Sequence, residues 1–182
     1  MAIKSTVFKV DLQISDLDNN SYRNHLLTLA RHPSETNERM IMRVIAFALH
    51  AADDLQFTRG ISSDDEPDIW RKNLVNEIEI WIELGQPDEK RIRKACARSK
   101  KVVIYTFNPR SASIWWEQIK NKLTRFSNLT VINLSMAEPD VLEEMVERTV
   151  QFQCTIEDGQ IWLSTGSLML QITQEIWQTE HK

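Results

Sequence analysis

The sequence of 182 residues contains only two cysteines, Cys96 and Cys154. Two cysteines cannot form a disulfide framework or a multi-cysteine zinc site. Both lie at apolar positions of their local patterns, so we predict that they are small buried hydrophobic residues. Four glycines and five prolines leave little material for flexible linkers. Because this length supports one full core and is short for two, the sequence predicts a single domain over residues 1–182.

The common signatures of nucleotide binding and of hydrolytic catalysis are also missing. The sequence has no GxxxxGK[ST] phosphate loop, no GxGxxG after a strand and no GxSxG nucleophile elbow. The four histidines lack the spacing of zinc ligands; they are His25, His32, His50 and His181. No apolar run approaches membrane-spanning length, and the N-terminal residues lack the apolar segment of a signal peptide. We therefore expect a cytoplasmic protein with no membrane partner.

The charge is slightly negative overall, at −4, but the basic residues are clustered. Seven of the 22 Lys and Arg residues lie between Lys90 and Lys101. The overall balance argues against a protein that coats nucleic acid non-specifically. It leaves room for a local basic groove.

The most informative stretch runs from Ser62 to Arg98. It begins with acids at positions 64, 65, 66 and 68. A period-two apolar alternation then predicts a strand over Ile78–Leu84, and a helix over Asp88–Arg98 follows, with acids first and cations later. If these parts fold together, carboxylates of the loop and strand face a basic helix. Carboxylates hold hard divalent cations, and basic side chains hold phosphate.

The remaining chain alternates between strand and helix patterns, which predicts a mixed α+β (α/β) domain. Ser34 is the expected N-cap of the first helix, and the order strand, helix, strand, helix after residue 78 indicates parallel pairing with crossovers. Asp158-Gly159 is a strong hairpin signal, so the C-terminal part should be an antiparallel meander. The periodicities place strands over 8–14, 22–32, 102–107, 129–134, 150–156, 161–163 and 168–172, and helices over 35–53 and 111–126 and from 139 onward.

One acid on the first predicted helix departs from the expected pattern. Glu38 lies on the same helical stripe as Ile41 and Ile45. An acid that points at a core needs a partner, a cation or a raised pKa. We expect its carboxylate to lie within one water of Glu83 or of the acidic loop; otherwise it turns out to solvent one turn from the helix start.

The central stretch resembles the PD-(D/E)XK nuclease superfamily. Pro67-Asp68 is similar to the PD element, and Ile82-Glu83-Leu84-Gly85 is similar to the (D/E)xK element. More specifically, the strings ARHPSETNERM, FTRG, SDDEP, WIELGQPDEKRIRKAC and IEDGQIWLS resemble the bacterial YaeQ family over almost the whole chain. The resemblance implies a restriction-endonuclease-like core, followed by the meander.

The same resemblance implies a divalent-metal-dependent phosphodiesterase. Asp68 and Glu83 would hold Mg²⁺, or Mn²⁺, with Glu38 supporting it through water and Glu66 as a further ligand. The loop offers several acids for the PD position, and Pro67 before Asp68 favours Asp68. The alternative is a non-catalytic adaptor on this fold that binds nucleic acid or a transcription-related protein; a third is a purely structural protein.

The sequence departs from the superfamily at Gly85, where a catalytic lysine is expected. That lysine ordinarily stabilises the charge of the transition state. Arg91 or Lys94 of the following helix would replace it. Helical geometry favours Arg91, which flanks the apolar stripe, over Lys94, which points mostly outward. An arginine does not act as a base at neutral pH, so Arg91 would serve only as a phosphate clamp.

Overall fold

The computed structural model describes residues 4–182, apart from the side chain of Ser62. The fold is of the mixed α+β class that the sequence predicts. The chain forms two compact units, which we describe separately. The first unit contains the residues up to Ala51 together with Met136–Thr173. The second contains Ala52–Ser135 together with Gln174–Lys182.

The first unit is built on strands in the order β2-β1-β8-β9-β10. β1 and β2 pair as an antiparallel hairpin, and β8 joins β1 in parallel. β8, β9 and β10 are antiparallel, which confirms the predicted meander. Asp158 and Gly159 both have positive φ, at 51° and 73°, as the tightest hairpin turns require. The elements of this unit are β1 (Thr6–Asp16), β2 (Ser21–Arg31), α1 (Asn37–Leu49), α4 (Pro139–Met145), β8 (Thr149–Glu157), β9 (Gln160–Thr165) and most of β10 (Leu168–Gln178).

Helix α1 begins later and ends earlier than the sequence predicts. Thr36, not Ser34, is the N-cap, and its hydroxyl accepts a hydrogen bond from the Arg39 amide at 3.1 Å. The Ser34 hydroxyl is instead engaged with Nδ1 of His32 at 2.6 Å. Two hydroxyl residues lie two positions apart before the helix, and the first of them contacts the histidine instead of capping the helix. The prediction of Ser34 as the cap was therefore wrong.

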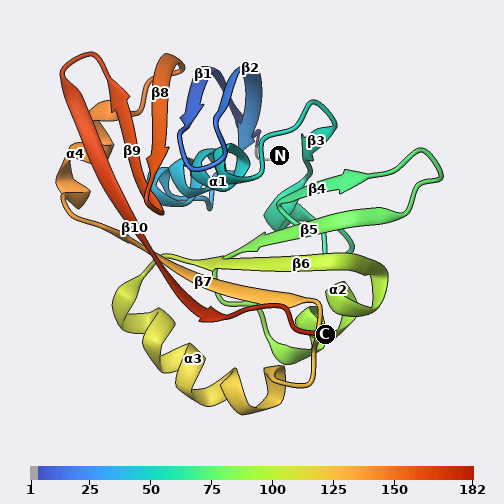
Figure 1. Ribbon diagram of the computed structural model, residues 1–182. Coiled ribbons are helices and arrows are strands. Elements are labelled where there is room, and N and C mark those ends of the chain that lie inside the picture. The colour runs from blue at the N-terminus through green and yellow to red at the C-terminus, as the bar shows by residue number, and fades with distance from the viewer. Residues whose placement is uncertain (1–3) are drawn as a thin grey trace. The chain divides into compact units, whose positions relative to one another are not determined.

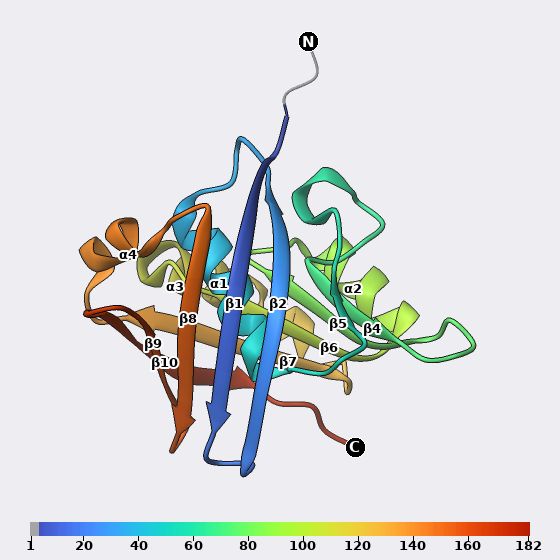
Figure 2. The same ribbon diagram turned by 90° about the horizontal axis from the view of Figure 1, so that it is seen from above.

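A buried ion pair joins α1 to the segment that precedes it. The Glu35 carboxylate accepts hydrogen bonds from Arg43 at 2.7 Å and from Arg39 at 3.0 Å. Arg43 also donates to the carbonyl of Ala30 in β2 at 3.2 Å. Figures 1 and 2 show α1 against β1 and β2. The ring of Phe47 in α1 also packs edge-on against the ring of His25 in β2, with 5.1 Å between the ring centroids. Both Glu35, which precedes α1, and Arg43, which lies within it, are buried.

The second unit has strands in the order β7-β6-β5-β4-β3 and ends with the last residues of β10. β3, β4 and β5 are antiparallel, whereas β5, β6 and β7 are parallel. Helix α2 connects β5 to β6, and α3 connects β6 to β7, which confirms the predicted parallel crossovers. The elements are β3 (Leu55–Phe57), η1 (Gly60–Ser62), β4 (Ile69–Lys72), β5 (Ile78–Leu84), α2 (Glu89–Arg98), β6 (Ser99–Thr106), α3 (Pro109–Leu123) and β7 (Leu129–Met136).

The core of the second unit lies between its two helices and strands β5–β7. In Figure 1, α2 and α3 lie on the same side of β6 and β7. The half-buried ring of Trp116 in α3 stacks on Trp177 at the edge of this core, 5.4 Å away. The buried members of the cluster are Ile78, Trp81, Ile92, Ala95, Val102, Ile104, Ile119, Leu123, Leu129 and Val131. Among the described residues no helix is long and apolar enough to span a membrane.

The two cysteines are buried to different extents. Cys154 is buried, as predicted, whereas Cys96 of α2 is only partly buried because it lies at the edge of the helix stripe. Burial raises the pKa of the Cys96 thiol to about 11 and, together with Asp16, that of Cys154 to about 12. Neither thiol is therefore a nucleophile at neutral pH.

Candidate functional site

Asp68 and Glu83 lie side by side in the second unit. Asp68 immediately precedes β4, Glu83 is the penultimate residue of β5, and the antiparallel register pairs Ile69 with Ile82. The Asp68 amide donates to the carbonyl of Ile82 at 3.1 Å, and its carboxylate accepts a hydrogen bond from the Leu84 amide at 2.8 Å. Asp68 is 1% exposed and Glu83 is 7% exposed. The strand pairing thus places two acids together in a largely dry environment.

The Glu83 carboxylate has two donors. Nε of Arg91 donates to one oxygen at 2.7 Å, and the indole N–H of Trp81 donates to the other at 2.9 Å. Burial raises the pKa of Glu83 above its ordinary value, and the charge of Asp68 raises it further; Arg91 and Trp81 oppose that shift only in part. Burial and the neighbouring charge of Asp68 thus disfavour the ionised form of Glu83.

The acidic loop, residues 63–66, is held against α2 by basic side chains. Arg91 donates to the carbonyls of Asp64 at 3.2 Å and Glu66 at 2.8 Å. Lys94 pairs with the Asp65 carboxylate and contacts the Asp64 carbonyl at 3.4 Å. Arg98 donates to the Asp65 carbonyl at 3.0 Å. The hydrogen bond from Lys94 lowers the pKa of Asp65. The loop thus meets the basic helix mainly through its main chain.

The other two predicted metal ligands lie outside this pair. The Glu66 side chain accepts a hydrogen bond from the Arg59 amide at 3.3 Å, and it is the Glu66 carbonyl that meets Arg91. Glu38 belongs to α1 of the first unit, where it is partly buried. Burial, and then the nearby Glu143, raise the pKa of Glu38. Its predicted place within one water of Glu83 stays a prediction.

Two glycines shape the surroundings of the pair. A Cβ on Gly60 would lie 3.0 Å from Oδ1 of Asp68, so only glycine lets this turn approach the carboxylate so closely. Gly85 has φ +103°, a conformation that strains any L side chain. A lysine at position 85, directly after β5, would therefore be strained by this backbone, although its Cβ would meet open space.

Beside Glu83 lies a narrow apolar recess with no room for a water molecule. Trp81, Arg91 and Ile92 contribute to its walls. In the part of the chain that the structure describes, no group of three His, Cys, Asp or Glu side chains is arranged to hold a metal. The carboxylate pair therefore offers two acidic side-chain ligands.

Sequence reasoning missed three contributors to this site. Trp81 has the pattern of a core residue, so its role as a donor to Glu83 has no signal in the sequence. The Leu84 amide acts through the main chain, which is invisible to residue patterns. Gly60 could have been found from the sequence, because glycine is rare in this chain and is the residue that favours a positive φ, which Gly60 adopts.

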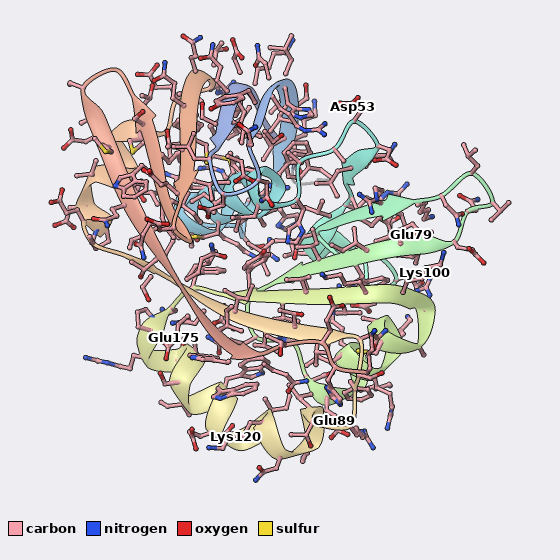
Figure 3. All side chains as sticks on the ribbon, in the orientation of Figure 1. Asp53, Glu79, Glu89, Lys100, Lys120 and Glu175 are labelled. Atoms are coloured by element: carbon pink, nitrogen blue, oxygen red, sulfur yellow. The ribbon has the colours of Figure 1, made fainter. Side chains whose placement is uncertain are left out.

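Glu79, which shares β5 with Glu83, pairs instead with Lys100 on the surface at 2.6 Å (Figure 3).

Together, the fold and the site define a mixed α+β protein with a buried carboxylate pair set beside a basic helix. The family model described as YaeQ protein matches residues 1–174, and the chain belongs to the YaeQ family. It is 46% identical to the YaeQ protein of Salmonella typhi over 98% of both chains. The identity to the YaeQ protein of Escherichia coli K12 is 45%, with the same coverage.

Two solved structures share the fold over nearly the whole chain. The crystal structure of the YaeQ protein from Xanthomonas axonopodis pv. citri superposes with a TM-score of 0.91 at 42% identity, covering 96% of this chain and 99% of that one. The YaeQ protein from Pseudomonas syringae gives a TM-score of 0.89 at 30% identity, with 97% of each chain covered. The similarity therefore extends through both units.

Proposed function

We propose that the second unit carries a PD-(D/E)XK nuclease-like core with a divalent-metal-dependent phosphodiesterase centre at Asp68 and Glu83. The order of elements supports this proposal. Three antiparallel strands, β3–β5, are followed by a crossover helix and a parallel strand, β6. The two acids occupy the start of β4 and the end of β5, as the superfamily resemblance implies. The observation that carries the proposal is a buried pair of adjacent acids with the Arg91 guanidinium bound to Glu83.

The donor chemistry of the pair suits Mg²⁺ or Mn²⁺. Asp68 and Glu83 supply hard carboxylate oxygens, and Mg²⁺ is commonly held by one or two carboxylates together with water and substrate phosphates. A third acidic ligand is therefore not required. When bound there, the metal would lower the pKa of a coordinated water and polarise the phosphoryl group. Glu38 and Glu66 remain candidate supports of such a site.

The protein's own groups would position the phosphodiester. Arg91 lies 2.7 Å from Glu83, so its guanidinium is placed to clamp a phosphate beside the pair. Lys94, one turn further along α2, is the second candidate. Because position 85 holds glycine in place of the expected lysine, the site lacks one preorganised cation that would contact the transition state. Loss of such a contact typically costs about 3 kcal/mol, so we expect cleavage to be roughly a hundredfold slower than in a complete site.

A second candidate is a non-catalytic adaptor on the same fold that binds nucleic acid or a protein. The backbone of Gly85, at φ +103°, favours this reading, because it would strain the usual lysine. The engagement of both Glu83 oxygens by Arg91 and Trp81 also favours it, since each donor competes with a metal. Under this reading the acid pair and Arg91 serve to hold the acidic loop on α2.

Calorimetric titration with Mg²⁺ and Mn²⁺ separates the two candidates. The phosphodiesterase reading predicts one site per chain that is lost in Glu83→Gln and Asp68→Asn. Glu79→Gln is the matched control, because Glu79 lies on the same strand but pairs with Lys100 at the surface. Cleavage of a labelled oligonucleotide should follow the same order. A wild-type chain that binds neither metal and cleaves nothing would remove the phosphodiesterase reading and leave the adaptor.

A further inference from the structure

Three cations form a straight row on one face of α2. Arg91, Lys94 and Arg98 are separated by three and four residues, so each lies about one turn from the next. At about 1.5 Å of rise per residue the cation row extends over roughly 10 Å. Arg91, at one end, also touches Glu83, so the row begins at the carboxylate pair.

Oxygen atoms of the acidic loop accept hydrogen bonds along the whole cation row. The carbonyls of Asp64, Asp65 and Glu66 and the carboxylate of Asp65 together receive hydrogen bonds from all three cations. A phosphodiester backbone also presents successive oxygens that Lys and Arg side chains bind. The loop therefore makes the type of contact that a nucleic-acid strand would make.

The loop is weakly held at its outer end. The side chains of Lys94 and Asp65 are 43% and 79% exposed, and exposed ion pairs contribute little to stability. Meanwhile the three carboxylates of the loop lie where they would repel an approaching polyanion. Contacts of this kind exchange readily for stronger anions, because a phosphodiester carries a full charge at every step.

We infer that the cation row of α2 binds the phosphodiester backbone of a nucleic acid, and that the acidic loop occupies the row until that strand displaces it. The inference deepens the proposed function, since the displaced loop would leave the strand beside Asp68 and Glu83. It does not require a metal or cleavage. Because the overall charge is −4, the attraction for nucleic acid has to come from the local cation row. Covering this row with the acidic loop keeps the affinity for nucleic acid low in the resting state.

The test measures binding of a fluorescein-labelled 20-nucleotide DNA by anisotropy at low salt in EDTA, where no cleavage occurs. The loop variant Asp64→Asn/Asp65→Asn/Glu66→Gln removes three charges without changing side-chain size. We expect it to bind at least about fivefold more tightly than the wild type, because the competing charges are gone. The control variant Glu117→Gln/Glu175→Gln/Glu180→Gln removes three exposed acids elsewhere in the second unit, and it should gain much less.

The cation row itself is tested in the loop variant. Lys94→Gln/Arg98→Gln should abolish the gain and reduce the salt dependence of binding by about one unit per lost contact. Lys90→Gln/Arg93→Gln changes the same charge on the same helix outside these contacts and should keep most of the gain. If the loop triple does not fold, Asp65→Asn against Glu180→Gln makes the same comparison. Equal gains in the loop and control variants, or no gain in either, would overturn the inference, even if metal binding at Asp68 and Glu83 were found.

Discussion

Asp68 and Glu83 are neighbours across the β4–β5 pairing, and the negative charge of Asp68 helps to raise the pKa of Glu83. A carboxyl group with a raised pKa stabilises the fold fully below its unfolded pKa, near 4.5. That contribution is lost as the pH rises through the folded-state pKa. At neutral pH the ionised form of Glu83 therefore costs stability, which Arg91 and Trp81 offset in part. Natural sequences retain such costs most often at functional sites.

Arg91→Ala should destabilise the protein by about 2 kcal/mol. It leaves a buried Glu83 without its cation and releases two carbonyls of the acidic loop. Loss of one partner from a fully buried ion pair costs more, and the partial exposure of Arg91 reduces the effect. Urea denaturation at pH 7 measures it. Arg93→Ala, at an exposed position of the same helix, should change the free energy of unfolding by less than about 0.5 kcal/mol.

The double variant Arg91→Ala/Glu83→Gln distinguishes the charge effect from a packing effect. Removing the charge of Glu83 should restore a large part of the stability lost in Arg91→Ala. Failure of this rescue would mean that the guanidinium acts mainly through the loop carbonyls.

Gly85→Ala and Gly85→Lys should both destabilise the fold, by about 1–2 kcal/mol and to a similar extent. The φ of +103° strains any side chain, whereas a Cβ at this position meets open space, so the larger lysine adds no clash. Denaturant midpoints of the two variants provide the measurement. A lysine variant as stable as the wild type would contradict this conformational account.

The pH dependence of Glu38 is predicted by its raised pKa. Burial and the nearby Glu143 disfavour the charged form, so its stabilising contribution is complete below pH 4.5 and declines as the pH rises. Glu38→Gln should accordingly be more stable than the wild type at pH 7, by a few tenths of a kcal/mol because Glu38 is only partly buried and solvent screens the effect. The difference should vanish near pH 4. Thermal unfolding at both pH values tests this, with the exposed Glu144→Gln as the control.

Thr36→Ala should cost about 1 kcal/mol, the usual value for loss of an N-cap hydroxyl. Ser34→Ala, two residues earlier, should cost clearly less, since its hydroxyl contacts only His32. Chemical denaturation of the two variants gives a direct comparison. The reverse order would restore Ser34 as the functional cap.

The local elements were largely predictable because their patterns are strong. The alternation in Ile78–Leu84 and the continuous apolar run at Val102–Ile104 predicted a covered parallel pair, and both strands are found paired in parallel. Helix ends were less predictable. Asn108 caps α3 three residues earlier than the predicted start at Ser111, because Pro109 fits the first turn. Ends depend on single hydrogen bonds that periodicity does not encode.

The site was predictable in its residues but not in its contacts. The nearness of Asp68 to Glu83 follows from a register that only the turn between β4 and β5 sets. The helical argument for Arg91 over Lys94 as the neighbour of Glu83 agrees with the structure, where Arg91 reaches the strand and Lys94 reaches the loop. The buried pair of Glu35 and Arg43 gave no signal, because charged residues at a helix start are usually exposed.

The parallel pairing of β1 with β8 has a consequence for how the chain is made. Val10 and Val150 are partners in this ladder, yet residues Ala52–Ser135 of the second unit are encoded between them. During synthesis the β1–β2 hairpin and α1 leave the ribosome long before β8 is made. Their apolar faces stay uncovered by β8 until about a hundred further residues are added, at roughly 5–20 residues per second. β1 therefore pairs with β8 only late in synthesis, and truncation before β8 should leave a nascent chain that aggregates or recruits a chaperone.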